Sequence, residues 1–313
     1  MSPRQTPFRW LTLVPPAAVL IACGGDPASP GAPAPTAPTT LSVSAGALAL
    51  AMTGTPRLLT VTNTGTQSAL NVAATVSQAL PVGTTVVSTC GTLAPGASCT
   101  ITVTPGAVPS AAPGDLNPTP ARLAIAGSNT NNLSVDVQVI GQGSVHQGGY
   151  VFAIDDSTPN TGSIGGKVAG LGDVSATAPW SADAGGVALA VDVVGAGSLT
   201  DGSANTSAIV AAVPAGVAFH AAGLCAGSSA QGYSDWYLPA ICELQGAGGI
   251  CPVASNNVQS LVNSGIGGLA GIYWSSTQLS PSAAFAQDTV SGTAFTVNKI
   301  TLLPVRCARP LTP

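Results

Sequence analysis

Residues 41–140 contain short runs in which apolar and polar residues alternate, and this pattern constrains the fold more than any other feature of the chain. The runs are rich in β-branched residues and cover 41–44, 58–62, 70–76, 85–87, 100–104 and 133–139. Clusters of Gly, Pro and Asn separate them, and almost no helical periodicity is present. A period of two places successive side chains on opposite faces of a strand. We therefore predict one all-β sandwich over 41–140.

Two stretches of this domain resemble a known repeat. Val61-Thr-Asn-Thr-Gly65 and the segment from Cys90 to Pro105 resemble the immunoglobulin-like (Ig-like) repeats of bacterial surface proteins. In those repeats two cysteines face each other across a hairpin, which implies a disulfide between Cys90 and Cys99. Closing this short loop would stabilise the domain by roughly 2–3 kcal/mol. A zinc site at the same pair is the weaker alternative, because no His lies nearby.

The N-terminus has the order of a secretory signal, with Arg4 and Arg9 followed by an apolar run and then Cys23. This run is shorter than the roughly 20 residues that a spanning helix needs. Leu20-Ile-Ala-Cys23 resembles the lipobox of bacterial lipoproteins, which implies a signal peptide over 1–22 and a lipid on Cys23. An ordinary secreted chain is the alternative. Gly24 in place of Asp favours the outer membrane of a bacterial envelope.

The residues that follow the signal are unlike a folded domain. Residues 23–40 are, after the cysteine, almost entirely Pro, Ala, Gly, Ser and Thr. This composition cannot bury a core and favours extended polyproline II segments. We expect a tether between the lipid and the sandwich.

A second domain is predicted after a flexible linker at 141–148, because the composition changes there. Residues 149–313 hold three of the four Trp. Strands are predicted at 149–154, 166–170, 272–277, 283–289, 293–299 and 305–308, and helices at 207–213, 217–225, 240–245 and 256–263. Asn205 or Thr206 would cap the first helix, and Pro239 would open the third. This order implies an α+β domain.

Three ordered blocks in this domain carry a second resemblance. Gly232-Tyr-Ser-Asp-Trp-Tyr-Leu-Pro-Ala-Ile-Cys-Glu-Leu244, Tyr273-Trp-Ser-Ser-Thr277 and Val305-Arg-Cys-Ala-Arg309 resemble the Lcl C-terminal domain family, named after a bacterial collagen-like adhesin. The match covers residues 149–309. It implies a fold similar to the C-type lectin domain and an extracytoplasmic location. The namesake adhesin forms trimers and binds sulfated glycosaminoglycans, so the resemblance also implies these two properties.

The small number of basic residues and the lack of collagen repeats argue against glycosaminoglycan binding and a collagen trimer in this chain. Residues 149–313 contain as basic residues only Lys167, Lys299, Arg306 and Arg309, fewer than their Asp residues, whereas polyanion binding needs excess cations. A sustained Gly-X-Y period, which would impose a collagen trimer, is absent from the sequence. The whole chain has 8 Lys+Arg against 12 Asp+Glu, so nucleic acid is not expected as a partner.

The remaining cysteines, Cys225, Cys242, Cys251 and Cys307, allow three disulfide connectivities. We prefer Cys242–Cys251, across a Gly-rich loop, and Cys225–Cys307. A catalytic thiol would need a base, and His220 is the only His near any of them. Sulfatase-modifying enzymes share a C-type-lectin-like fold and use reactive cysteines, which leaves an enzyme as an alternative. Their accompanying motif is absent, so we do not expect catalysis.

The candidate ligand-binding residues are Asp235, Trp236, Trp274, Ser275 and Ser276. Indole faces with nearby hydroxyls suit sugar rings. The favoured alternative makes both indoles core residues and Asp235 a turn residue that accepts backbone N–H bonds before the Pro239 helix. The Asp residues lack the spacing of a calcium loop, so no metal or cofactor is expected. His146 is interpreted as a linker residue.

Together these patterns predict an all-β Ig-like sandwich followed by an α+β C-type-lectin-like domain. The expected function is adhesion: a lipid-anchored envelope protein that recognises a glycan or a surface protein through its C-terminal domain. A structural envelope lipoprotein without a diffusible ligand is the alternative, and an enzyme on a lectin-like scaffold is a third. The sequence leaves the oligomeric state open.

Overall fold

The computed structural model describes residues 37–158, 161–245, 249–251 and 257–313. The expected signal peptide, Cys23 and most of the tether lie outside the described residues. Thr39 already belongs to the folded part, because its N–H donates to the Asn129 carbonyl at 2.9 Å and it forms a bridge with Thr130. The tether expected over 23–40 therefore ends before Thr39. Among the helices of the described ranges, none is long and apolar enough to cross a bilayer.

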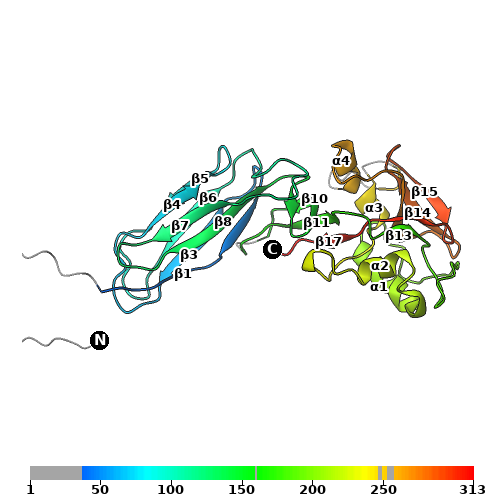
Figure 1. Ribbon diagram of the computed structural model, residues 1–313, viewed down its shortest axis with the longest axis horizontal. Helices are drawn as coiled ribbons and strands as arrows, with labels where there is room; N and C mark the ends of the chain where they lie inside the picture. Colours follow the sequence, from blue (N-terminus) through cyan, green and yellow to red (C-terminus); the bar gives the residue numbers. More distant parts are fainter. Residues whose placement is uncertain (1–36, 159–160, 246–248, 252–256) are drawn as a thin grey trace, which may run out of the picture. The chain divides into compact units, whose positions relative to one another are not determined.

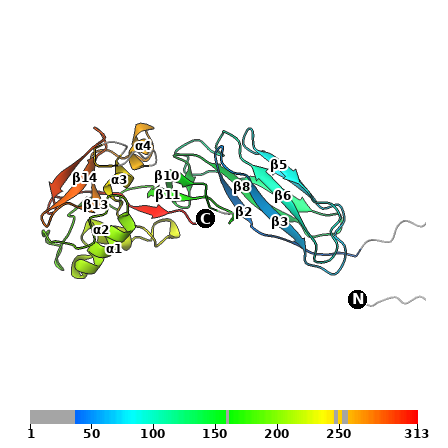
Figure 2. The same ribbon diagram turned by 180° about the vertical axis from the view of Figure 1, so that it is seen from behind.

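Eight strands form two four-stranded sheets in the N-terminal part (Figures 1 and 2). One sheet has the order β1-β3-β6-β5, with β1 Leu41–Val43, β3 Arg57–Asn63, β5 Thr85–Ser88 and β6 Ser98–Thr104. The other has the order β2-β8-β7-β4, with β2 Ala47–Ala51, β4 Ala73–Gln78, β7 Ala121–Ala126 and β8 Leu133–Ile140. Only β2 and β8 pair in parallel among these neighbours.

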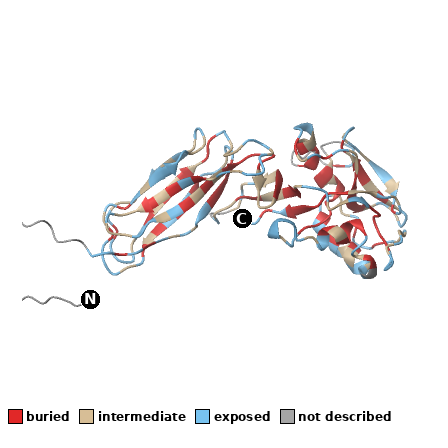
Figure 3. Cartoon of the chain, in the orientation of Figure 1, coloured by how far each residue is buried: buried red, intermediate tan, exposed pale blue. Residues whose placement is uncertain are grey.

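Side chains from both sheets meet in one core, as the alternating pattern predicts. Leu59 and Val61 of β3 pack in the same cluster as Leu123 and Ile125 of β7, and all four are fully buried. Figure 3 shows the resulting alternation of buried and exposed residues along the strands. The expected all-β sandwich is therefore present. The disulfide Cys90–Cys99 closes the turn before β6, with Cα atoms 5.0 Å apart.

Four short helices and a set of small sheets form the C-terminal part (Figure 1). The strands are β9 Val145–His146, β10 Gly149–Asp155, β11 Gly165–Gly170, β12 Ser175–Ala178, β13 Ile272–Gln278, β14 Ala283–Asp288, β15 Thr293–Asn298, β16 Leu303–Val305 and β17 Ala308–Pro310. The helices are α1 Gly202–Ala212, α2 Ala221–Ala226, α3 Ile241–Leu244 and α4 Val258–Asn263. The sheets have the orders β17-β11-β10-β9, β12-β16 and β13-β14-β15.

Local chemistry moves several boundaries from their expected places. Helix α1 begins at Gly202 because the Asp201 side chain accepts from the Ala204 N–H, so Asn205 and Thr206 are not its caps. Helix α2 begins only at Ala221, because the extended His220 caps it by accepting from the Gly223 N–H. Pro214–Gly216, inside the expected range, forms a separate 3-10 turn. The junction at 141–148 contains β9, which pairs with β10, so His146 is a strand residue.

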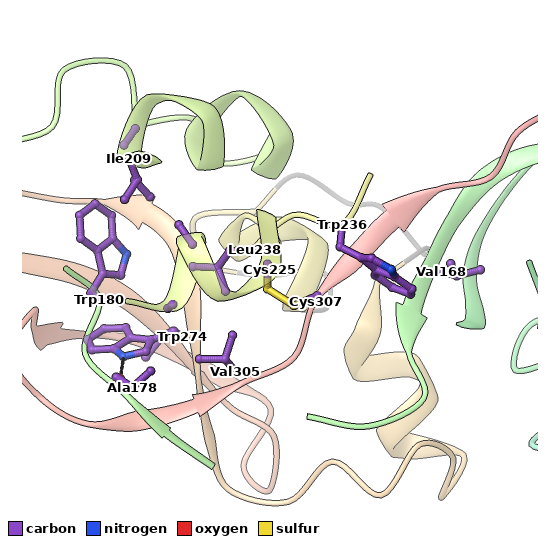
Figure 4. Close-up of a cluster of buried hydrophobic side chains, with 14 of the residues drawn as sticks. Val168, Ala178, Trp180, Ile209, Cys225, Trp236, Leu238, Trp274, Val305 and Cys307 are labelled. Atoms are coloured by element: carbon purple, nitrogen blue, oxygen red, sulfur yellow. Dashed lines mark hydrogen bonds between the residues drawn. A yellow bond between two sulfur atoms is a disulfide. The ribbon is translucent and has the colours of Figure 1, made fainter. Parts of the chain in front are cut away.

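The core of this part is built around indoles (Figure 4). Trp180 and Trp274 are fully buried, and their Nε1–H groups donate to the carbonyls of Ser275 at 2.9 Å and Ala178 at 2.8 Å. The disulfide Cys225–Cys307 crosses the same cluster and joins α2 to the segment before β17. Buried indoles need such acceptors, which fix the rings relative to the backbone.

A buried carboxylate anchors two helix starts. Glu243 of α3 accepts from the backbone N–H of Ala240 at 2.8 Å and of Gly202 at 3.2 Å. Its other oxygen binds the Tyr237 hydroxyl at 2.9 Å and the Lys167 ammonium. Burial and the adjacent Glu243 charge raise the pKa of Tyr237 far above its usual range. This network connects β11, α1 and α3.

Candidate functional site

Trp236 lies where two surface depressions meet the core. The segment around it is extended, because Tyr237 exchanges backbone hydrogen bonds with Ala308 at 2.8 and 2.9 Å. Successive side chains of an extended segment point to opposite sides. Trp236 accordingly packs in the buried apolar cluster that contains Trp180, whereas Tyr237 packs in a second buried apolar cluster. Trp236 is only 3% exposed, yet it lines both depressions.

The first depression is rich in hydroxyl groups. It has a volume of about 310 Å³ and lies between α1 and the segment that precedes Tyr237. Its polar lining residues are Ser203, Thr206, Ser207, Ser234, Asp235 and Tyr237. The hydroxyls of Thr206 and Tyr237 are already bonded within the fold, to Leu238 and Glu243, so the exposed hydroxyls are those of the three serines. Ser203 and Ser207 are exposed and stand one turn apart on α1, so they share a face of the helix. We call this depression the Asp235 site.

Asp235 is held in one orientation by Arg309 of β17. Arg309 Nε donates to Oδ1 at 2.6 Å and Nη2 donates to Oδ2 at 3.0 Å. The guanidinium is 1% exposed, stacks on the Tyr233 ring at 3.8 Å and also donates to the Gln147 carbonyl at 2.9 Å. The Asp235 side chain keeps 44% of its surface exposed. A carboxylate fixed in this way retains lone pairs that can accept hydrogen bonds from a ligand.

The second depression is smaller and more apolar. It has a volume of about 210 Å³ and is lined by Leu171, Val174 and Trp236, with Asp173, Ser228 and Gln231 as polar members. Asp173 is already engaged, since Arg306 Nε donates to it at 2.6 Å and the Tyr273 hydroxyl at 3.1 Å. Gln231 has a φ of 57°, which is uncommon for a residue with a Cβ.

The other expected ligand-binding residues lie in the core. Trp274, Ser275 and Ser276 are each fully buried. The Ser275 hydroxyl donates to the Phe285 carbonyl at 2.7 Å, and the Ser276 hydroxyl accepts from Asn205 at 3.2 Å. Figure 4 shows Trp274 beside Trp180, whereas Trp236 lies near Cys307. A ligand on the surface therefore cannot touch these three residues. The core role weighed for the two indoles describes Trp274, and Trp236 belongs to the same core cluster.

The cysteines of the described ranges are all in disulfides. The pairs are Cys90–Cys99, Cys225–Cys307 and Cys242–Cys251, which match the preferred connectivity. His220 is buried and caps α2, because its Nδ1 accepts from the Gly223 N–H at 3.1 Å, and burial lowers its pKa. None of these six sulfurs is a thiol that His220 could activate.

Sequence reasoning found two members of the Asp235 site and missed the rest. Asp235 and Trp236 belong to a recognisable block, whereas Ser203 and Ser207 are ordinary exposed residues of a Ser- and Ala-rich helix. Arg309 belongs to another of the blocks, but its pairing with Asp235 spans 74 residues and is visible only in the fold. No group of three or more His, Cys, Asp or Glu side chains suited to a metal occurs among the described residues.

Comparisons with known proteins place few limits on the function. No protein-family model matches the chain, and no curated protein sequence matches it. Among solved structures, domains 4 and 5 of the S-layer protein SbsC match at 18% identity and a TM-score of 0.24, over 32% of this chain and 44% of theirs. The E. coli chaperone DraB matches at 14% identity and 0.25, over 34% and 58%. WR4, a C. elegans MSP family member, matches at 10% and 0.24, over 32% and 97%.

Proposed function

We propose that residues 149–313 form a recognition domain that binds a neutral, hydroxyl-rich ligand, a glycan, at the Asp235 site. The observation that carries this proposal is the half-exposed Asp235 carboxylate, fixed by Arg309 at a depression lined with hydroxyl groups. Sugar hydroxyls are donors that an oriented carboxylate accepts, and they also bind Ser and Thr hydroxyls. A fixed acceptor loses little conformational entropy on binding.

The charges favour a neutral glycan over a sulfated one. Lys167, Arg306 and Arg309 are paired with Glu243, Asp173 and Asp235. The fourth basic side chain, Lys299, is fully buried. A sulfate group would therefore meet no uncompensated cation of the described domain, and it would face the acidic edge of Asp235. This arrangement supports an uncharged sugar as the ligand, one that carries no sulfate or other anionic group.

The proposal includes display on a bacterial envelope. The three disulfides support an oxidising compartment, where such bonds persist. A signal peptide over 1–22, a lipid on Cys23 and an Ig-like sandwich as spacer would hold the binding domain away from the outer membrane. We also propose that 149–313 is a C-type-lectin-like domain of the Lcl C-terminal family. The three ordered sequence blocks support this assignment, and the pairing of β17 with β11 brings the two ends of the domain together.

Binding is tested with the full chain, kept oxidised, on an array of neutral and sulfated glycans. We expect saturable binding to neutral glycans, weakened about tenfold or more by Ser207→Leu, which fills the Asp235 site. Ser228→Leu, in the second depression, is the matched control and should leave binding unchanged. Loss with Ser228→Leu alone would move the site to the second depression. Absence of saturable binding to every glycan would favour a structural role and contradict the proposal.

The anchor is tested separately. The variant Cys23→Ala cannot carry a thioether-linked lipid, so it should move from the membrane fraction to the soluble fraction. A variant that still fractionates with membranes would contradict lipidation at Cys23.

A further inference from the structure

Lys299 is a buried lysine without an acidic partner in contact. It follows β15 and is fully buried, with its ammonium nitrogen 4.1 Å from the centre of the Trp180 ring. Its Nζ donates to the Val191 carbonyl at 2.6 Å and to Oε1 of Gln278. The ion pairs found among the described residues do not include Lys299. Burial lowers its pKa to about 8, although the nearby Asp192 charge opposes this shift.

The carboxamide of Gln278, at the end of β13, is polarised from both sides. Its Oε1 accepts from the backbone N–H of Val193 at 2.9 Å as well as from Lys299. Its Nε2 donates to the Asp192 carboxylate at 2.7 Å. Donors on the carbonyl oxygen stabilise the negative charge that develops when a nucleophile adds to the carbon. A carboxylate at the amide nitrogen can relay a proton to it.

The geometry points to a covalent modification: we propose that Lys299 and Gln278 form an intramolecular isopeptide bond with the help of Asp192. This inference is independent of the proposed glycan site, which lies at other residues. It requires no cofactor, oxidant or reductant, because the exchange of one amide nitrogen for another is redox-neutral.

The reaction balances when Lys299 reacts as the neutral amine, after its ammonium has lost one proton to solvent, which a pKa of about 8 allows. The lone pair of Nζ attacks Cδ of Gln278, whose Oε1 it already contacts. Asp192, which contacts Nε2 of the same carboxamide, then takes one proton from Nζ in the addition intermediate. The tetrahedral intermediate carries its charge on Oε1, which the Val193 N–H stabilises. Asp192 returns the proton to Nε2, the Cδ–Nε2 bond breaks, and ammonia leaves. Holding amine and carboxamide together within the fold replaces a slow encounter with an intramolecular step.

The bond would connect the end of β13 to the residue after β15 across the sheet β13-β14-β15. The backbone of Lys299 is also fixed: its carbonyl accepts from the backbone N–H of Trp180 at 2.9 Å, and its backbone N–H donates to the Ser282 carbonyl at 3.0 Å. The crosslink would therefore join the two outer strands of this sheet covalently, in addition to the backbone hydrogen bonds at Lys299. A buried, neutralised amine also removes the cost of a buried charge.

Peptide mapping of the full chain decides the matter, because the sequence contains only two lysines, Lys167 and Lys299. With a free Lys299, trypsin digestion of the reduced, alkylated protein gives peptides 168–299 and 300–306. With the isopeptide bond, cleavage after Lys299 is blocked, and a peptide 168–306 appears that is lighter by one ammonia. A second protease should then release a branched peptide that joins Gln278 to Lys299.

Variants separate this bond from other losses of ammonia, such as cyclisation at Asn. We expect the mass loss to disappear in Lys299→Arg and Gln278→Met and to be slowed in Asp192→Asn. The matched controls Lys167→Arg and Asp183→Asn should keep it. Peptides 168–299 and 300–306 at full mass in the folded wild-type protein would overturn the proposal, as would a mass loss that persists in Lys299→Arg. The wild-type map remains decisive if a variant fails to fold.

Discussion

Arg309 binds both carboxylate oxygens of Asp235, at 2.6 and 3.0 Å, and thereby joins the last strand to the segment that carries Trp236. The guanidinium stacks on the ring of Tyr233, whose centre lies 3.8 Å from the guanidinium carbon. Bidentate pairing and stacking both depend on a planar cation. One residue therefore orients the proposed ligand acceptor and closes the domain.

The first prediction concerns this planarity. Arg309→Lys keeps the charge but loses the bidentate pairing with Asp235 and the stacking on Tyr233, so it should lower the free energy of unfolding by about 2 kcal/mol. Arg122→Lys is the control, because the Arg122–Asp136 pair is exposed and should contribute less than about 1 kcal/mol. Urea denaturation followed by circular dichroism measures both. Equal effects of the two substitutions would contradict the anchoring role of Arg309.

Much of the fold follows from local patterns, and the exceptions have local causes. Alternating β-branched runs predict β3, β6 and β8, whereas β2 and β7 were missed because Ala-Leu-Ala-Leu-Ala and Ala-Arg-Leu-Ala-Ile-Ala lack that signature. The start of α1 was misplaced because several polar residues near it are good caps, and only the fold shows that Asp201 is used.

The candidate site was predictable only in part. Asp235 and Trp236 stand in a motif and do line a depression, but Trp274 stands in one as well and is buried. A motif rich in aromatic and hydroxyl residues has the same appearance whether it packs a core or meets a ligand. Long-range packing decides between the two, and a single sequence does not contain it.

The second prediction concerns the buried Glu243. Glu243→Gln replaces an acceptor of four hydrogen bonds by a group that carries its own N–H donors, so unfolding should become easier by about 2–3 kcal/mol. Tyr237→Phe removes only one of these donors and should cost about 1 kcal/mol. Trp fluorescence in urea reports on this domain. A larger effect for Tyr237→Phe than for Glu243→Gln would contradict the central role of the carboxylate.

The third prediction ranks two disulfides of the same domain. Cys225 and Cys307 are 82 residues apart, whereas Cys242 and Cys251 are 9 apart. Because a longer closed loop restricts the unfolded chain more, replacing the first pair by Ala should cost about 4.5 kcal/mol and the second about 2.5 kcal/mol. Thermal unfolding of the two double variants tests the order. The reverse order would show that native-state contacts, and not the unfolded chain, decide the effect.

The last prediction concerns acid. Burial, with a smaller contribution from the Arg309 charge, lowers the pKa of His146 from 6.5 to about 4. Between these values the unfolded chain binds a proton that the folded chain does not, so stability is lost as the pH falls from about 6.5 to about 4. The loss from His146 is at most about 3.4 kcal/mol. His220, whose pKa burial also lowers, adds to this loss of stability.

Urea denaturation at a series of pH values should therefore show a shallower pH dependence of the unfolding free energy for His146→Asn than for the wild type. His220→Asn, which retains a capping side chain for α2, should also flatten the curve, and an unchanged slope in His146→Asn would contradict the burial of a neutral imidazole at that position.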